Sequence, residues 1–306
     1  MSSSELQKSK FSVAITTEKY QSLIRNTLGD PERAKRFIAT ITSAVAVNPM
    51  LQNCEAGSIL AGALLGESLN LSPSPQLGQF YLVPFDVTVK GSDGKALRDE
   101  NGEIKKTKKA SFVLGYKGYI QLALRSGYYK HLNVIAVKEG EYVKYNPFTE
   151  ELCCNWIEDE ERRESLPTVG YAAMFEYLNG YQKVLYWTKG AMLIHADRFS
   201  PAFSAAAYAK LLAGEVADRD MWKYSSFWYK EFDDMAKKTM LRQLISRWGV
   251  MSTELQTAFG KDQSPIEIDK GGSFIASDDA AGMIPAGTPI IPEAVDVAEK
   301  IDLNNV

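Results

Sequence analysis

The chain of 306 residues has few residues of the kinds that metal, redox and nucleotide chemistry require. It contains three cysteines, of which Cys153 and Cys154 are adjacent, and two histidines that lie 64 residues apart. Such cysteines cannot form a disulfide framework or the spaced ligand pairs of a zinc site, so we expect a reducing, cytoplasmic compartment. No G-x-x-x-x-G-K-[ST] motif occurs, which argues against a P-loop ATPase. We therefore expect no ATP and no resident cofactor.

Long hydrophobic runs are also missing. The longest uncharged stretch, Phe37 to Cys54, is interrupted by polar side chains and by Pro49, so it is a poor match to the roughly 20 apolar residues that span a bilayer. Residues 1–10 are polar and lack the apolar segment of a secretory signal. We expect a protein that is neither secreted nor attached to a membrane.

Acidic residues are absent from one long segment. Residues 104–138 contain no Asp or Glu but eight Lys or Arg. The following segment, 139–176, holds ten acidic residues against three basic ones, and 261–306 holds nine against three. Because the whole chain has a net charge of −3 and the last segment contributes −6, residues 1–260 carry +3. Such segregation is typical of a face that binds a polyanion and a separate face that repels it.

Helix and hairpin signals alternate along the chain. Asp30 and Pro31 are typical of a helix start, and Asn179-Gly180 is typical of a tight hairpin. The strand at 79–89 and the strand at 108–114 are expected to form an extended antiparallel hairpin with a basic tip. We predict helices at 31–47, 54–69, 115–127, 188–196 and 226–248, and strands at 79–89, 108–114, 132–138, 169–178 and 181–187. This order predicts an α+β fold in which an antiparallel, hairpin-rich sheet packs with helices.

Composition divides the chain into three parts. Residues 1–30 form an N-terminal segment that we expect to contact other copies of the chain, and 31–260 form the core. Beyond Gly260 the aromatic residues nearly vanish, so 261–306 is predicted to be a flexible acidic tail that could dock a partner. A polar helix that covers the core is the alternative for this tail.

The basic segment includes a helix with a polar stripe. Lys117, Gln121 and Arg125 are four residues apart, which places them along one side of a helix at intervals of about 6 Å. This interval is close to the spacing of phosphates along a nucleic-acid strand. Aromatic residues interleave with the charges, and a positive groove with stacking rings is typical of sequence-independent single-strand binding. These aromatics are Phe112, which we expect in the core, Tyr116, Tyr119, Tyr128 and Tyr129.

Two further groups of charged residues are candidates for function. A basic cluster on the last long helix consists of Lys237, Lys238, Arg242 and Arg247, and preceding aspartates could pair with the lysines. Asp86, followed by Glu103 and Lys105, weakly resembles the carboxylates and lysine of a Mg²⁺-dependent nuclease. A Glu103→Ala substitution would test the nuclease interpretation, because a nuclease that uses Glu103 should lose its activity.

Several ordered motifs are similar to those of a known family. They are Asn48–Leu51 (NPML) with Cys54, Gly78–Phe85 (GQFYLVPF), Leu114–Ala123 (LGYKGYIQLA), Arg125–Gly127 (RSG), Trp228 and Phe232–Thr239 (FDDMAKKT). On these motifs, which are spread over residues 48–260, the chain resembles the RecT family of phage single-strand annealing proteins.

The resemblance implies ATP-independent annealing of single-stranded DNA to a complementary strand, within a ring or a helical filament, during homologous recombination. It also implies a phage 5′ to 3′ exonuclease and a host single-strand binding protein as partners, in the cytoplasm of a bacterial host. No catalytic residue is implied, so the protein is not expected to be an enzyme, and Mg²⁺ enters only as a counterion of DNA. The motif positions imply that DNA is bound by Gln79, Tyr81, Tyr116, Lys117, Gln121, Arg125, Lys237, Lys238 and Arg242.

Charge adds Lys106, Lys108 and Lys109 to the predicted DNA-binding set, although strand alternation alone does not tell which of them face the DNA. Contacts to phosphate and sugar would leave the base edges exposed for pairing, so binding should depend steeply on salt and little on sequence. A passive protein that coats single strands without annealing them is the remaining alternative.

Overall fold

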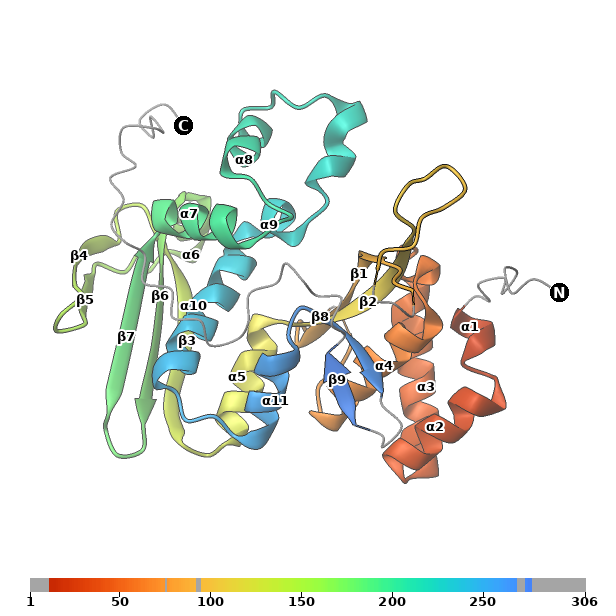
Figure 1. The fold of residues 1–306 in the computed structure, drawn as a ribbon. Helices are drawn as coiled ribbons and strands as arrows, with labels where there is room; N and C mark the ends of the chain where they lie inside the picture. The colour runs from red at the N-terminus through yellow and green to blue at the C-terminus, as the bar shows by residue number, and fades with distance from the viewer. Residues whose placement is uncertain (1–10, 75, 92–94, 269–272, 277–306) are drawn as a thin grey trace. The chain divides into compact units, whose positions relative to one another are not determined.

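The structure is a computed structural model that describes residues 11–74, 76–91, 95–268 and 273–276. Contacts divide the described residues into unit 1, which holds those up to Tyr128 and those from Val250 onward, and unit 2, which holds Tyr129–Gly249. Each unit combines helices with antiparallel strands (Figure 1). The predicted α+β class is confirmed, and the stretch treated as one core contributes to both units.

Unit 1 is built around a sheet with the strand order β1-β2-β8-β9. The helix predicted at 31–47 is α3, and the Asp30 carboxylate caps it by accepting the backbone N–H groups of Glu32 and Arg33. Helices α1 and α2, from the N-terminal segment, pack against α3. The elements of unit 1 are α1 (Phe11–Ala14), α2 (Glu18–Leu28), α3 (Pro31–Ala46), η1 (Leu51–Asn53), α4 (Ala56–Ser68), β1 (Phe80–Thr88), β2 (Lys106–Leu114), α5 (Tyr116–Arg125), α11 (Thr253–Lys261), β8 (Ser264–Ile268) and β9 (Phe274–Ala276).

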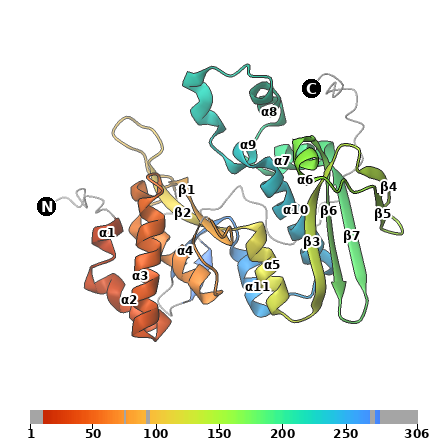
Figure 2. The same cartoon turned by 180° about the vertical axis from the view of Figure 1, so that it is seen from behind.

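Helix α4 forms the centre of unit 1. It packs against β1 and β2 (Figure 2), and every residue from Ser58 to Gly66 is buried. A Cβ atom at Gly66 would lie 2.3 Å from the ring of Phe80, so glycine is required where the helix meets the strand. The small residues of this helix therefore allow it to pack closely against β1.

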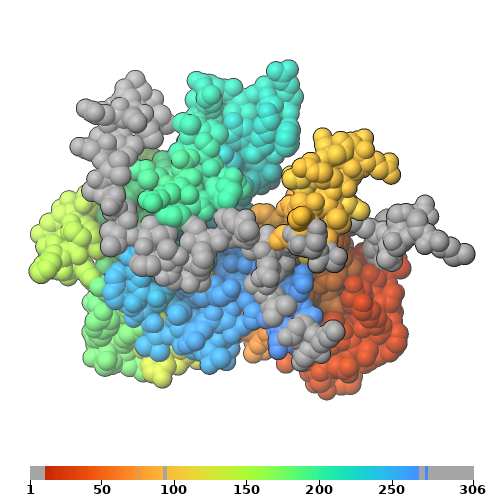
Figure 3. All heavy atoms as spheres, in the orientation of Figure 1, coloured from red at the N-terminus to blue at the C-terminus, as the bar shows by residue number. Residues whose placement is uncertain are grey.

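The predicted extended hairpin is formed by β1 and β2, which pair from Phe80 with Leu114 to Thr88 with Lys106. Residues 95–105 between these strands are exposed and project from the surface of unit 1 (Figure 3). The far edge of β2 pairs with β8, which places Ser111 opposite Pro265.

Ordered structure continues past Gly260, where we placed the start of the acidic tail. Asp262 is buried, and its carboxylate accepts the Leu114 N–H and the Tyr119 hydroxyl, each at 2.8 Å. A segment that supplies a buried carboxylate and a strand belongs to the core, so the tail begins later than the composition indicated. The remainder of the predicted tail, 269–272 and 277–306, lies outside the described residues, as do residues 1–10 of the N-terminal segment.

Unit 2 contains a three-stranded sheet of order β3-β6-β7 and the two-stranded hairpin β4-β5. Gly180 has φ 84° at the predicted tight turn between β6 and β7, and the Thr188 hydroxyl accepts the Ala191 N–H at the start of α7. The elements are β3 (Tyr129–Lys138), β4 (Tyr142–Asn146), β5 (Glu151–Cys154), α6 (Glu160–Ser165), β6 (Thr168–Tyr177), β7 (Gln182–Thr188), α7 (Lys189–Phe199), α8 (Ala205–Leu212), η2 (Asp218–Tyr224), α9 (Phe227–Lys230) and α10 (Phe232–Trp248).

The helix predicted at 226–248 is divided at Glu231, whose φ of −133° and ψ of 56° leave the helical region. Directly after the break, the Asp233 carboxylate accepts the hydroxyl of Tyr171 at 2.7 Å and that of Thr168 at 2.9 Å. These bonds join the first turn of α10 to β6, against which the helix packs (Figure 1). The break thus coincides with contacts between residues more than 60 positions apart, which local sequence signals do not report.

The acidic segment 139–176 is partly neutralised inside unit 2. Glu141 is fully buried, and its carboxylate is bound by the Arg163 guanidinium, with Nε 2.5 Å from Oε1. Burial alone would raise the pKa of Glu141, but the hydrogen bonds from Arg163 and from backbone N–H groups outweigh it and lower the pKa. Glu176 pairs with Lys130 at 2.7 Å. Part of the predicted repelling face therefore consists of structural ion pairs.

Within the described ranges, no helix combines the length and the apolar character needed to cross a membrane.

Candidate nucleic-acid interface

The loop before β1 lies directly on the first turn of α5 in unit 1. Gly78, with φ 61°, turns this loop, and the Gln79 carbonyl accepts the Gly115 N–H at 2.9 Å. Cβ atoms at Gly115 and Gly118 would lie 2.1 Å from backbone oxygens of the loop. The glycines of the G-Y-K-G motif therefore permit a close backbone approach, which side chains would prevent.

This approach creates a hollow of about 320 Å³ beside α5. Lys117 and Gln121, one helical turn apart, are exposed and form one side, and Gln79 forms the other. Among the described residues, Lys117 forms no ion pair, and the lining contains no acidic side chain. The hollow is lined by Gln76, Leu77, Gln79, Lys117, Ile120 and Gln121.

Two of the predicted tyrosines lie next to the hollow. Tyr81 is half-buried, and its hydroxyl oxygen and Lys117 Cδ are the atoms nearest to a Cβ built on Gly78. Tyr116 is also half-buried, with the Lys117 ammonium 6.0 Å from its ring centroid. The structure thus brings together five predicted residues: Gln79, Tyr81, Tyr116, Lys117 and Gln121.

The other aromatics of the basic segment have different environments. Phe112 is fully buried, as expected, but Tyr119 and Tyr129 are buried as well. Tyr119 is in the core because its hydroxyl binds Asp262, which no local pattern indicates. Only Tyr128, with an exposed fraction of 55%, offers an open ring among these four residues.

Arg125 is exposed on the same helix, but its guanidinium is engaged. It donates to the carbonyls of Leu69 and Asn70, each at 2.8 Å, and so closes the C-terminal end of α4. The pattern of four-residue spacing therefore places Arg125 correctly on the surface without revealing this structural role. A substitution at Arg125 would disturb the end of α4 as well as remove a charge.

The register of β1 and β2 decides which strand lysines share a face. Lys106 and Lys108 lie on the same face of β2 as Phe112, and α4 covers this face farther along the strand. Lys109 lies on the other face. Lys108 pairs with Asp86 at 2.7 Å, and Lys109 pairs with Glu267 at 2.9 Å. Lys106 is exposed and has no ion pair within the described ranges. The three lysines therefore do not form one row.

The remaining predicted residues belong to unit 2. Lys237 pairs with Asp234 at 2.7 Å, which confirms the predicted intrahelical ion pair. Lys238 is 4% exposed and so lies inside unit 2 rather than on its surface, because this side of α10 is the buried one. Arg242 is half-buried.

Arg242 belongs to a basic group that the sequence analysis identified only in part. Arg198 on α7, Arg242 and Arg247 on α10 all lie close enough to His195 to act on it electrostatically. Burial first, and then these three charges, lower the pKa of His195 to about 4. His195 packs between the rings of Trp187 and Phe199, with centroids at 5.2 and 4.8 Å. Arg198 was missed because nothing in the sequence indicates that α7 lies beside α10.

The comparison with known families matches the model of the RecT family over residues 35–273. The chain belongs to the RecT family. It is 36% identical over 239 residues to the uncharacterized protein YqaK of Bacillus subtilis (strain 168), covering 78% of this chain and 68% of that protein. It is 24% identical over 243 residues to the Protein RecT of Escherichia coli (strain K12), covering 79% and 76%. The family resemblance inferred from the motifs is confirmed, and it implies in general terms a role in single-strand annealing and recombination.

The two acidic residues of the nuclease alternative lie on β1 and in the turn before β2 of this RecT-family chain. Asp86 accepts a hydrogen bond from Lys108, whereas Glu103 lies in the turn where its N–H donates to the Asp99 carboxylate. Among the described residues, no group of three or more Asp, Glu, His or Cys side chains is arranged to hold a metal ion.

Proposed function

We propose that this protein anneals complementary DNA strands without ATP, and that unit 1 holds one strand by its phosphates along the hollow beside α5. The observation that carries the proposal is the position of Lys117: an exposed ammonium, in a lining without carboxylates, one turn from Gln121. A phosphate entering this hollow would meet a positive charge and amide donors at once.

The mechanism is one of positioning. Lys117 neutralises a phosphate and releases its counterions, while the amides of Gln79 and Gln121 fix the register of the backbone. The Gln79 side chain is already held, because its Oε1 accepts the Ser72 N–H at 2.7 Å. A strand held in this way keeps its base edges exposed, so that a complementary strand can test them. Neutralised phosphates also reduce the repulsion between the two strands.

The proposed function also requires an oligomer and protein partners. We propose that the protein acts as a ring or helical oligomer, since pairing of long strands requires many adjacent sites. A phage exonuclease would supply the single strand, and a host single-strand binding protein would deliver the second. Mg²⁺ would act only as a counterion of DNA.

The test is annealing of two complementary fluorescent oligonucleotides, added in sequence without ATP. Lys117→Ala combined with Gln121→Ala should abolish annealing and lower the magnitude of the log–log salt slope of binding by about 0.7, the value for one phosphate contact on a single strand. Lys130→Ala is the matched control, because Lys130 belongs to the same basic segment but is paired with Glu176. It should anneal like the wild type.

Each outcome has one meaning. Binding without annealing by the wild type would favour the passive coating protein. Normal annealing by the Lys117 and Gln121 variant would place the strand elsewhere on the molecule. Degradation of the strands that is lost in Glu103→Ala would favour the nuclease.

A further inference from the structure

We propose a second phosphate-binding position, at Arg36 on α3, where the single strand continues after it leaves the hollow beside α5. The inference rests on the proposed function and extends it to a surface that the sequence analysis did not include. Arg36 is exposed and, within the described ranges, no carboxylate pairs with its guanidinium.

The position of Arg36 follows from a second hollow in unit 1. This hollow, of about 370 Å³, lies between one face of α3 and the chain that follows α4. Gln79 lines both hollows, so the two are neighbours on the surface of unit 1. Arg33, Arg36 and Thr40 contribute from α3, where spacings of three and four residues place them on one face.

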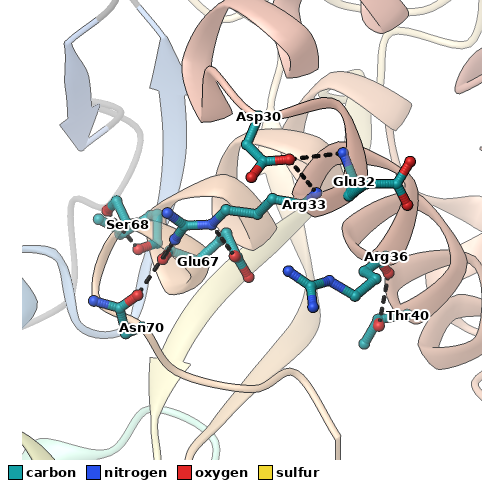
Figure 4. A network of polar contacts seen from close by, with 9 residues as sticks. Asp30, Glu32, Arg33, Arg36, Thr40, Glu67, Ser68 and Asn70 are labelled. Carbon is teal, nitrogen blue, oxygen red and sulfur yellow. Dashed lines mark hydrogen bonds and ion pairs between the residues drawn. The ribbon is translucent and has the colours of Figure 1, made fainter.

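Arg33, the other arginine of α3 in this hollow, is already paired, which leaves Arg36 as the cation available to a ligand. Arg33 is committed to α4, with Nε 2.7 Å from the Glu67 carboxylate and a further bond to the Asn70 side chain (Figure 4). Arg125 donates to the backbone carbonyl of Asn70. The ion pair with Arg33 neutralises Glu67, the acidic side chain in the lining, and leaves the charge of Arg36 uncompensated there.

Two acidic residues at the start of α3 lie near Arg36, and both are occupied: Glu32, four residues earlier, pairs with Lys35 at 2.7 Å, and Asp30 caps the helix. The charge of Arg36 contributes to the lowered pKa of Asp30, but backbone N–H groups of Arg33 and Glu32 are the main cause. Asp30 is the N-cap of α3, and its carboxylate accepts these two N–H groups at 2.7 and 3.0 Å. Its role as a cap holds it at the helix end, while Arg36 lies nearly two turns farther along α3.

A phosphodiester strand fits this surface better than an acidic protein segment does. The two hollows share the lining residue Gln79, and each has one cation that forms no ion pair among the described residues, Lys117 in the first and Arg36 in the second. Separate, unpaired positive charges on neighbouring parts of one surface are what a phosphate backbone can bind. Binding of an acidic segment of a second copy is the competing outcome of the test.

The experiment compares Arg36→Gln with Lys35→Gln in full-length protein. Lys35 is the matched control because it is the adjacent residue of α3, equally charged and exposed, but is paired with Glu32 at 2.7 Å. Binding is measured by fluorescence anisotropy as a function of salt, with labelled oligonucleotides of about 6 and about 20 nucleotides, which bracket the usual site sizes. Equal urea midpoints of the variants establish that each is folded.

Arg36→Gln should weaken binding of the long oligonucleotide several-fold and reduce the magnitude of its salt slope by about 0.7. It should leave the short oligonucleotide, which occupies only the first hollow, unchanged. Arg36→Lys should restore the slope, and Lys35→Gln should behave like the wild type.

The inference fails if Arg36→Gln and Lys35→Gln bind both oligonucleotides alike while Lys117→Ala still weakens binding. It also fails if Arg36→Gln changes the oligomeric state, measured by sedimentation, without changing the salt slope. Failure of the proposed function is distinct: the wild type would then show no salt-dependent binding of either oligonucleotide.

Discussion

Removal of the Asp262 carboxylate should destabilise unit 1 by about 2–6 kcal/mol. Its two oxygens satisfy the Leu114 N–H and the Tyr119 hydroxyl in a site with an exposed fraction of 7%. In Asp262→Ala both donors would be buried without a partner, and each such group costs about 1–3 kcal/mol. Neither donor can turn to water, since one belongs to β2 and the Tyr119 ring packs edge-on against Phe259 at 4.9 Å.

A double-mutant cycle isolates this contribution. Tyr119→Phe alone should cost about 1.5–3 kcal/mol, as expected for a hydrogen bond to a charged group, but nearly nothing in the Asp262→Ala background. Glu267→Ala is the control, because this glutamate lies on β8, shortly after Asp262, in an ion pair with Lys109 at the surface and should cost less than about 1 kcal/mol.

Urea unfolding followed by two probes gives the assay. All five tryptophans of the chain lie between residues 156 and 248, within unit 2, whereas far-UV circular dichroism reports both units. Asp262→Ala should shift the dichroism transition, and a tryptophan transition that stays in place would show that unit 2 unfolds separately. A cost below about 1 kcal/mol, or an unchanged cost of Tyr119→Phe in the double mutant, would refute the assignment of Asp262 to the core.

Three further predictions concern single positions. The pKa of His195 is about 4 in the folded state, against 6.5 for the ordinary side chain, so the unfolded state takes up its proton first as the pH falls. The free energy of unfolding of unit 2 should therefore fall by up to about 3 kcal/mol between pH 6.5 and 4. His195→Gln should remove this pH dependence in unfolding followed by tryptophan fluorescence. Gly118→Ala would put a Cβ 2.1 Å from a backbone oxygen of the facing loop, so it should weaken binding of single strands, whereas Gly260→Ala, which meets no atom within 4 Å, should not. Arg163→Met would leave the Glu141 carboxylate buried and unpaired, and should cost about 3–5 kcal/mol in the same unfolding assay.

Features encoded within a few residues were predictable from the sequence. The cap at Asp30, the turn at Gly180 and the helix start at Thr188 all occur where the local pattern placed them. The stripe of Lys117 and Gln121 was predictable for the same reason, because helical spacing alone puts both on one side.

Features that depend on distant partners were not predictable. Asp262 was assigned to a tail by composition, although its partner Tyr119 lies 143 residues earlier. The pair of Lys109 and Glu267 joins positions 158 residues apart. A single sequence does not show which residues far apart in the chain are in contact. The extent of the core and the pairing of charges could therefore not be predicted from it.

The count of charges was therefore a poor guide to where phosphate binds. Of the eight cations in residues 104–138, the structure holds Lys108, Lys109 and Lys130 in ion pairs and commits Arg125 to backbone carbonyls. A cation already facing a carboxylate gains little from a phosphate, because the new attraction replaces an existing one. What identifies a binding position is a cation left without such a partner beside donors held in place. By that criterion a single residue outside the basic segment, Arg36, carries more weight than most of the lysines within it.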